Sequence, residues 1–383
     1  MKELIKFEWK KIWQSPLTIL ATLALLFTCI VLNSLNFSIN GFTRGESETR
    51  ILDYEYLTQA VEELDLNEDN INIIQWSLPH DHPLLAAIPL IGFTSIYNED
   101  NFEDMLTSEE AFYEQYKKSL SLNTQSANDW NWFEYTEEQM ERINERINQL
   151  QTPLQLGSNN GILSFLLQYN HLYILVLVII TFLLSPLFAE DSPQGIDELT
   201  LALKYSRKKD FNARIITGNL LSVTIYTIFI ACLLIQNAFV LSLQGWNQSI
   251  QSLWVHAFYN MSVGTGVSIV IFDGLITVLL IANLIMFISI KVKKAKLTTI
   301  ISVATLGGLT QLANTSNPLY AQLNPIFFAT RRFGIGANWG FEFYLFIGDL
   351  MIPYTVAFII LSGCYFIVIR YLTIREYKRY TLN

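Results

Sequence analysis

The sequence predicts an all-α polytopic membrane protein, with six transmembrane helices and a mainly helical extracellular domain inserted between spans 1 and 2. Long apolar runs recur along the 383 residues, of which 51% are hydrophobic and 15% are charged, and the mean hydropathy is +0.31. Of the 25 Lys and Arg residues, 17 lie in four short segments that flank these runs. This composition indicates a chain whose main solvent is lipid, and the grouped cations indicate its topology.

The four cationic segments set the orientation. They cover residues 2–11, 204–214, 291–296 and 370–379. Because cytoplasmic loops are enriched in Lys and Arg, we expect all four on the cytoplasmic side of a plasma membrane, which we take to be bacterial. Both termini, including the tail at 370–383, are then cytoplasmic.

The first span is predicted at 17–35, a run long enough to cross about 30 Å of hydrocarbon. A cleaved signal peptide is the alternative interpretation. The run exceeds a typical signal core, and Asn33 to Asn36 make a poor small-residue cleavage site. We therefore expect a retained span.

Five further spans follow. Their residues are 166–188, around the apolar run 172–188, then 219–241, 267–290 and 297–312, so that spans 3 to 5 occupy 215–312, and finally 346–369. The fifth run has only about 16 residues and contains Gly307 and Gly308. We expect this span to be tilted, broken or completed by neighbouring residues.

The segment 36–165 is the predicted extracellular domain. Its central part, 41–160, carries 23 acidic and 6 basic residues, a net charge of −17 that leaves +8 on the rest of the chain. Amphipathic helices are predicted at 54–64 and 137–150. The apolar stretch 83–97 fits the core of this domain better than a segment lying on the outer leaflet.

The acidity of this domain has two interpretations. It concentrates cationic molecules through its long-range field, or it only keeps an extracellular surface soluble, which we favour. His80, Asp81 and His82 do not define a metal shell, so we expect a turn before Pro83 and no metal site. The three cysteines, which all lie in predicted spans, fit packing residues.

The sequence contains no catalytic motif. The patterns GxxxxGK[ST], HExxH and GxSxG are missing, and Gly334 and Gly336 lack a strand-to-helix context. We expect no catalytic residue, no cofactor and no nucleic-acid partner. Uphill transport then needs an ion gradient or a separate subunit that hydrolyses ATP.

The segment 189–214, after the second span, is amphipathic. Pro193 suits the start of a helix, and Ile196, Leu199 and Leu203 then share one face, spaced by three and four residues. A helix of this kind beneath the membrane can dock into a groove on a partner. We therefore interpret 189–214 as a coupling region.

This segment resembles the main cytoplasmic motif of the permease subunits of type-2 ABC transporters. The matching residues are Glu190, Gly195, Leu199, Ser206 and Arg207. Residues 1–16, with Phe7, Trp9 and Trp13, also resemble that family's amphipathic N-terminal helix, and the spans are similarly distributed. The resemblance implies that two permeases pair, as identical or related chains in the lipid bilayer. It also implies that two cytoplasmic ABC ATPases, which bind ATP and Mg, contact the helix 196–203.

The stretch 313–345 resembles the family's re-entrant helices at the outer end of the path, and an interfacial loop with an aromatic belt is the alternative. Two acids, Asp273 and Asp349, lie near the outer ends of spans 4 and 6. Intramembrane carboxylates usually face a cavity or pair with a cation, which Arg331 or Arg332 would supply here. Alternatively, both acids lie at the water boundary.

These observations predict a permease subunit of an ATP-driven exporter. The large first outer loop resembles the subgroup whose exporters handle peptides, antibiotics or ions, and lipid-linked molecules remain open as substrates. A membrane-anchored sensor, whose acidic domain detects a ligand, is the alternative. An ion-coupled carrier would show inverted repeats and broken mid-span helices, and the sequence shows neither convincingly.

Overall fold

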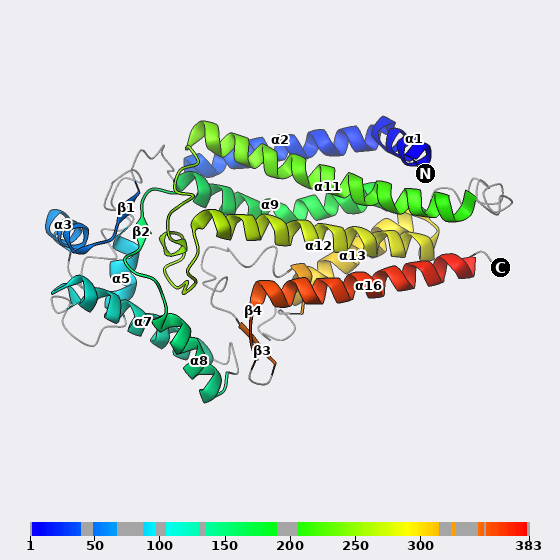
Figure 1. Ribbon diagram of the computed structural model, residues 1–383. Coiled ribbons are helices and arrows are strands. Elements are labelled where there is room, and N and C mark those ends of the chain that lie inside the picture. Colours follow the sequence, from blue (N-terminus) through cyan, green and yellow to red (C-terminus); the bar gives the residue numbers. More distant parts are fainter. Residues whose placement is uncertain are drawn as a thin grey trace.

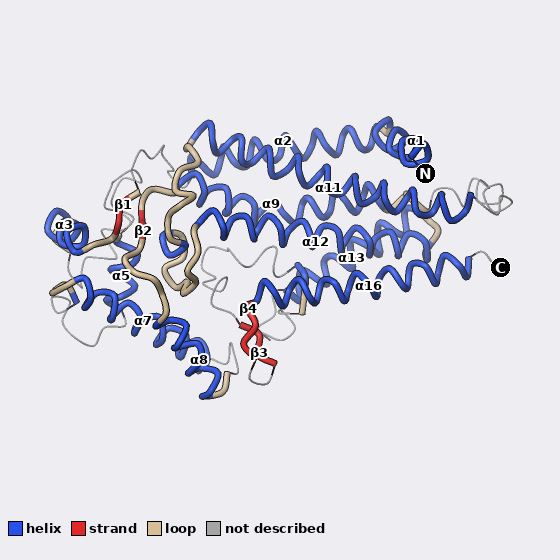
Figure 2. Tube along the Cα trace, viewed as in Figure 1, coloured by secondary structure: helices blue, strands red, loops and turns tan. Residues whose placement is uncertain are grey.

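A bundle of long helices and a smaller group of helices lie end to end along the molecule (Figure 1). The computed structural model describes residues 2–39, 49–66, 87–96, 105–129, 135–189, 206–313, 323–326, 344–347 and 350–380. Helices dominate these ranges, and two short two-stranded sheets accompany them (Figure 2).

Six helices form the bundle. They are α2 (Pro16–Ile39), α9 (Asn160–Leu184), α11 (Ser206–Val240), α12 (Val263–Val292), α13 (Ala295–Ala313) and α16 (Tyr354–Tyr380). Among the described residues, five of them, all except α13, are long and apolar enough to cross a membrane. The described chain is therefore that of an all-α, multi-pass membrane protein, with five candidate spans where the sequence predicted six.

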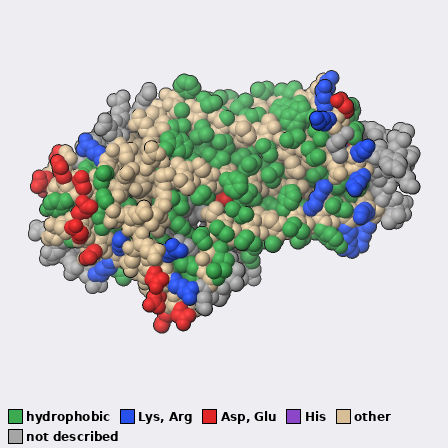
Figure 3. Space-filling view, in the orientation of Figure 1, with side chains coloured by type: hydrophobic (Ala, Val, Ile, Leu, Met, Phe, Trp, Pro, Cys, Tyr) green, Lys and Arg blue, Asp and Glu red, His purple; other side chains and the backbone are tan. Residues whose placement is uncertain are grey.

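The surface of the bundle is apolar, as a lipid-facing surface should be. Phe27 is 70% exposed, Phe239 80% and Ile367 70%. Hydrophobic side chains form a broad band over the bundle in Figure 3. Basic side chains gather beyond one end of this band and acidic side chains beyond the other. These two ends are called the basic end and the domain end below.

Helix α9 lies at the centre of the bundle and packs against α2, α11, α12 and α13. Close approach between α11 and α12 depends on Gly218, because a Cβ atom there would lie 2.6 Å from the sulfur of Met286. One turn further along, the side-chain amide of Asn283 donates to Asn219 Oδ1 at 2.8 Å. Small residues and interhelical hydrogen bonds of this kind hold helices together in lipid.

A short helix precedes the bundle. Helix α1 (Lys2–Gln14) lies at the basic end and contacts α11 and α2 (Figure 1). Trp9, Ile12 and Trp13 pack against the core of the bundle, whereas Phe7 is 64% exposed. Most of the charged side chains of this helix are exposed, whereas Glu8 is buried.

The ends of the spans differ from those predicted. Helix α9 begins at Asn160, before the predicted 166, and α11 begins at Ser206, well before 219. Nothing between Ser206 and Thr217 breaks a helix, because this stretch contains neither Gly nor Pro. The last part of the predicted coupling region, 206–214, is therefore the first part of α11.

The predicted start of the sixth span at 346 is wrong. Strands β3 (Tyr344–Ile347) and β4 (Leu350–Pro353) form an antiparallel hairpin, and α16 begins only at Tyr354. Pro353 explains this boundary, since proline lacks the N–H that a continuing helix would need and is compatible with a helix start. The periodicity of a short apolar run does not distinguish a strand from a helix.

The second group is the α3–α8 unit, residues 49–66, 87–96, 105–129 and 135–156. Its elements are β1 (Arg50–Ile51), α3 (Tyr54–Leu64), α5 (Ile88–Ile96), α7 (Glu109–Asp129), α8 (Glu137–Asn148) and β2 (Gln155–Leu156). Strands β1 and β2 pair and so join the start and end of the unit. Caps by Asp53 and Thr136 begin α3 and α8, which confirms both predicted helices.

Helix α5 forms the core of this unit. Ile88, Leu90 and Ile91 are fully buried in one cluster with side chains of α3, α7 and α8. For the described residues 87–96, the structure thus confirms that the apolar stretch is core.

The loop 241–262 between α11 and α12 connects the unit to the bundle. The hydroxyl of Tyr116 donates to the carbonyl of Val255 at 2.5 Å, and Phe258 is buried in the cluster of the unit. The imidazole of His256 packs edge-on against Phe93, with ring centroids 4.5 Å apart. Burial lowers the pKa of His256 to about 4. No pattern in the sequence predicts this contact between the loop and the α3–α8 unit.

Candidate functional site

The structure describes only part of the predicted site. Glu190, Gly195, Ile196, Leu199 and Leu203 lie outside the described residues, as do Arg331, Arg332 and Asp349, and so does the His80-Asp81-His82 sequence. Ser206 and Arg207 are the first residues of α11. Of the predicted membrane-embedded polar residues, only Asp273 lies within the described residues, and it is the centre of the candidate site.

Asp273 lies deep within the bundle on α12 and is fully buried. The hydroxyl of Ser289, near the basic end of α12, donates to the carbonyl of Ser185 at 2.8 Å, where α9 ends. Sixteen residues separate Ser289 from Asp273, which is about 24 Å along a helix. Because a hydrocarbon core is about 30 Å thick, this carboxyl group lies at membrane depth and inside the protein.

Three tyrosine side chains surround this part of α12. The hydroxyl of Tyr173 donates to the carbonyl of Gly274 at 2.8 Å, and that of Tyr226 donates to the carbonyl of Ile271 at 2.7 Å. The hydroxyl of Tyr169 lies 3.4 Å from that of Tyr226. All three tyrosines lie within range of an electrostatic interaction with Asp273. The tyrosine cluster, Tyr169, Tyr173 and Tyr226, thus joins α9 and α11 to α12 on both sides of Asp273.

Gly274 makes this close approach possible. A Cβ atom at this position would collide with the hydroxyl groups of Tyr169 and Tyr226. Any larger residue would therefore push α9 or α11 away from α12.

The tyrosine hydroxyls near Asp273 are engaged by the backbone. Tyr173 and Tyr226 each have one hydroxyl proton, and both protons go to backbone carbonyl groups. Intramembrane carboxylates usually face a cavity or pair with a cation, so the complete burial of Asp273 at this depth makes it a candidate functional residue.

One turn toward the basic end, α12 contacts a short insertion, in which Leu323 and Asn324 are not helical and Pro325 and Ile326 are helical. The hydroxyl of Thr277 donates to the carbonyl of Pro325 at 3.0 Å. Pro325 belongs to the inserted segment, residues 323–326, which lies between α12, α13 and α16. Within it, Asn324 is 4% exposed and Ile326 is fully buried in the core of the bundle.

The inserted segment is fixed by hydrogen bonds to two more helices. The amide of Asn324 donates to the carbonyl of Leu309 on α13 at 2.5 Å, and the hydroxyl of Tyr365 on α16 donates to the carbonyl of Leu323 at 2.7 Å. For these four residues, the position among the helices favours a re-entrant segment over an interfacial loop. The rest of 313–345 lies outside the described residues.

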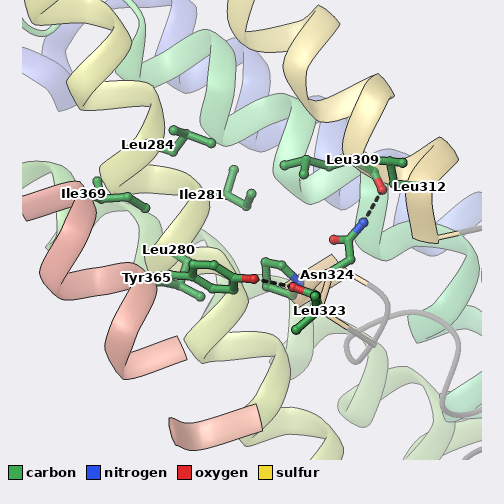
Figure 4. A pocket seen from close by; sticks show the side chains of 10 residues that line it. Leu280, Ile281, Leu284, Leu309, Leu312, Leu323, Asn324, Tyr365 and Ile369 are labelled. Carbon is green, nitrogen blue, oxygen red and sulfur yellow. Dashed lines mark hydrogen bonds between the residues drawn. The ribbon is translucent and has the colours of Figure 1, made fainter. Parts of the chain in front are cut away.

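A cavity of about 320 Å³ adjoins the inserted segment. Leucine and isoleucine side chains of α12, α13 and α16 form its walls, and Leu323, Asn324 and Pro325 form one end (Figure 4). Only Asn324 and Tyr365 bring polar side-chain atoms to it, and both make the backbone hydrogen bonds drawn in Figure 4.

The sequence indicated only part of this site. It singled out Asp273, but it did not predict the tyrosine cluster. One signal was present: Tyr169 and Tyr173 are four residues apart and so share a face of α9. The partner of Tyr173 lies 101 residues away and that of Tyr169 lies 57 residues away, and no local pattern identifies either.

Comparisons with known proteins identify no relative. No known family, no curated protein and no solved structure matches the chain. Within the part of the chain that the structure describes, no group of three or more His, Cys, Asp or Glu residues is suited to hold a metal ion.

Proposed function

We propose that the protein is the transmembrane permease subunit of an ATP-driven ABC exporter, which moves a substrate out of the cell or its membrane. The observation that carries this proposal is the inserted segment, which lies between three helices beside a cavity. Leu323 and Asn324 of this segment are not helical, and non-helical backbone at membrane depth is tolerated only where it is buried in protein or lines a cavity. A protein that only anchors a domain has no need of such an element.

In the proposed orientation, the basic end faces the cytoplasm and the α3–α8 unit lies outside the cell, as an inserted domain. The positive-inside rule supports this assignment, because α11 begins, α12 ends and α13 begins at the basic end, and Lys208, Lys291 and Lys296 belong to these helix ends. Helix α13 has 19 residues, or about 28 Å, slightly less than a hydrocarbon core of about 30 Å. It serves as the fifth of six spans, and neighbouring residues complete its crossing.

The energy comes from a partner. The chain has no phosphate-binding loop, so we assign ATP and Mg to two copies of a cytoplasmic ABC ATPase. In the sequence, residues 190–205 lie between the described end of the α9 segment at 189 and the start of α11 at Ser206. The predicted helix 196–203 within this connection is the proposed contact with the ATPase. A second permease, identical or related, completes the complex.

Co-purification tests this contact. We expect the chain to co-purify with an ATPase that carries GxxxxGK[ST] and is encoded beside it. A charge on the docking face should disrupt the complex, so Leu199→Asp should lose the ATPase. The matched control is Leu201→Asp, which places the same charge on the side of the helix opposite the face formed by Ile196, Leu199 and Leu203. An intact complex with Leu199→Asp would count against the proposal.

One observation favours the alternative, a membrane-anchored sensor. Phe346 and Met351 of the β3–β4 hairpin pack against the core of the α3–α8 unit, and the rings of Tyr135 and Phe346 lie 5.5 Å apart. A ligand bound to the unit would thus act on α16 through the hairpin that precedes it. Such a sensor requires no ATPase, so the same co-purification distinguishes the two functions.

A further inference from the structure

The cavity beside the inserted segment lies in the interior of the bundle, at membrane depth. On α12, Leu284 and Leu280 line the cavity, and they are five and nine residues from Ser289, or about 8 and 14 Å along the helix. On α13, Leu309 and Leu312 line it, and they are 14 and 17 residues from the start of that helix, or about 21 and 26 Å. The cavity therefore spans the middle of the bundle, within the thickness of about 30 Å of a hydrocarbon core.

The cavity opens toward lipid. At its rim, Leu312 is 50% exposed and Leu323 is 42% exposed. The neighbouring surface of α13 is also apolar, and Ile300 on that helix is 65% exposed. In Figure 4, Leu309 and Leu312 lie on one side of the cavity and Tyr365 and Ile369 on the other, so its walls come from α13 and α16, with α12 between them.

The chemistry of the walls selects an apolar occupant. Among the described residues that line the cavity, none is Asp, Glu, His, Lys or Arg, and the polar side chains of Asn324 and Tyr365 already donate to the backbone of Leu309 and Leu323. A polar ligand would find no partner that is not already engaged. The volume of about 320 Å³ falls within the range of small-molecule sites, about 300–1,000 Å³. Dry apolar cavities of smaller volume bind hydrocarbon ligands in other proteins.

We propose that this cavity binds one hydrocarbon chain of an amphipathic molecule that resides in the bilayer and enters between α13 and α16. The inserted segment closes the end of the site, because it is bonded to all three helices around it. On α12, Thr277 and Asp273 follow beyond this closure, spaced by four residues and hence on the same face. The assignment of this molecule as the transported substrate rests on the proposed function; binding of the chain does not.

Photolabelling of the full chain in lipid nanodiscs tests the site. The probe is a phosphatidylcholine with a diazirine group midway along one acyl chain, and adducts are located by mass spectrometry. We expect labelling of α12 around Leu280 and Leu284 to exceed labelling at Ile300 by at least several-fold, although Ile300 is the more exposed. Equal labelling at both places would overturn the proposal.

A second part of the photolabelling experiment uses variants that fill the cavity. Leu284→Phe narrows the interior, and Leu312→Trp blocks the rim at a half-exposed position where folding is less at risk. Both should reduce the α12 adducts several-fold. The control, Ile300→Phe, enlarges a lipid-facing residue of α13 and should leave them unchanged. Undiminished adducts in folded Leu312→Trp would also overturn the proposal.

The outcome is separable from that of the proposed function. Selective labelling of the cavity in a chain that binds no ATPase would establish the lipid site and contradict the permease. If the chain binds the ATPase but its cavity takes up no label, the permease is supported and the lipid site is contradicted.

Discussion

Replacement of Gly274 by alanine tests the tyrosine cluster most sharply. The added methyl group would collide with the hydroxyls of Tyr169 and Tyr226, so one of the helices must move. Overpacking of this kind costs about 1–3 kcal/mol. Displacing the hydroxyls also weakens two hydrogen bonds, Tyr226 to Ile271 and Tyr169 to Tyr226, at about 0.6 kcal/mol each in a membrane protein. The expected loss is about 2–4 kcal/mol.

The matched control is Gly307→Ala on α13. A Cβ atom there meets nothing within 4 Å, while the gain in helix propensity, about 1 kcal/mol, is common to both variants. Unfolding free energies are measured by SDS titration in mixed micelles, with loss of helical circular dichroism as the signal. We expect Gly307→Ala to be neutral or slightly stabilising.

A second change checks the cause. Tyr169→Phe removes the hydroxyl nearest to the added methyl group, so it should restore part of the stability lost in Gly274→Ala. If Gly274→Ala and Gly307→Ala unfold with the same free energy, or if Tyr169→Phe adds to the loss, then the described contact between α9, α11 and α12 is refuted.

Two further predictions concern charge. Asp273→Asn should impair export while expression stays normal, because the amide keeps the shape but can neither take up a proton nor meet a cation; protection of a deletion strain against toxic compounds is the measurement, and wild-type export would remove the idea. His256 titrates near 6.5 when unfolded and at about 4 when folded, so the unfolded chain binds more protons between these values. Stability is then complete above pH 6.5 and falls by about 3 kcal/mol as the pH drops to 4. His256→Phe should flatten this profile in acid-unfolding curves, and an unchanged profile would contradict it.

The spans could be predicted because a membrane imposes one strong condition, a long apolar helix. The helix at 54–64 was predictable for a related reason, since apolar side chains recur on one face and Asp53 caps its start. Element ends were less certain. Residues 344–347 and 350–353 are mainly apolar, which suits a strand or a helix, and only the pairing of these two segments decides between them.

The candidate site was predictable in its residue types but not in its arrangement. Asp273 stood out because an acid within a span is expensive. Its surroundings depend on Tyr173 meeting Gly274, residues separated by about a hundred positions. Likewise, nothing in the composition of 241–262 indicates that Phe258 lies in the core of the α3–α8 unit. Contacts of this kind follow from the folded arrangement and leave no local period in the sequence.

ATP hydrolysis by the reconstituted complex tests the central claim, that this chain is the permease of an ATP-driven exporter. The ATPase encoded beside the chain is measured in nanodiscs, alone and together with the chain. We predict that hydrolysis rises several-fold when wild-type chain is present, and that Leu199→Asp removes the increase while Leu201→Asp retains it. Hydrolysis that is the same with and without the chain would contradict the account.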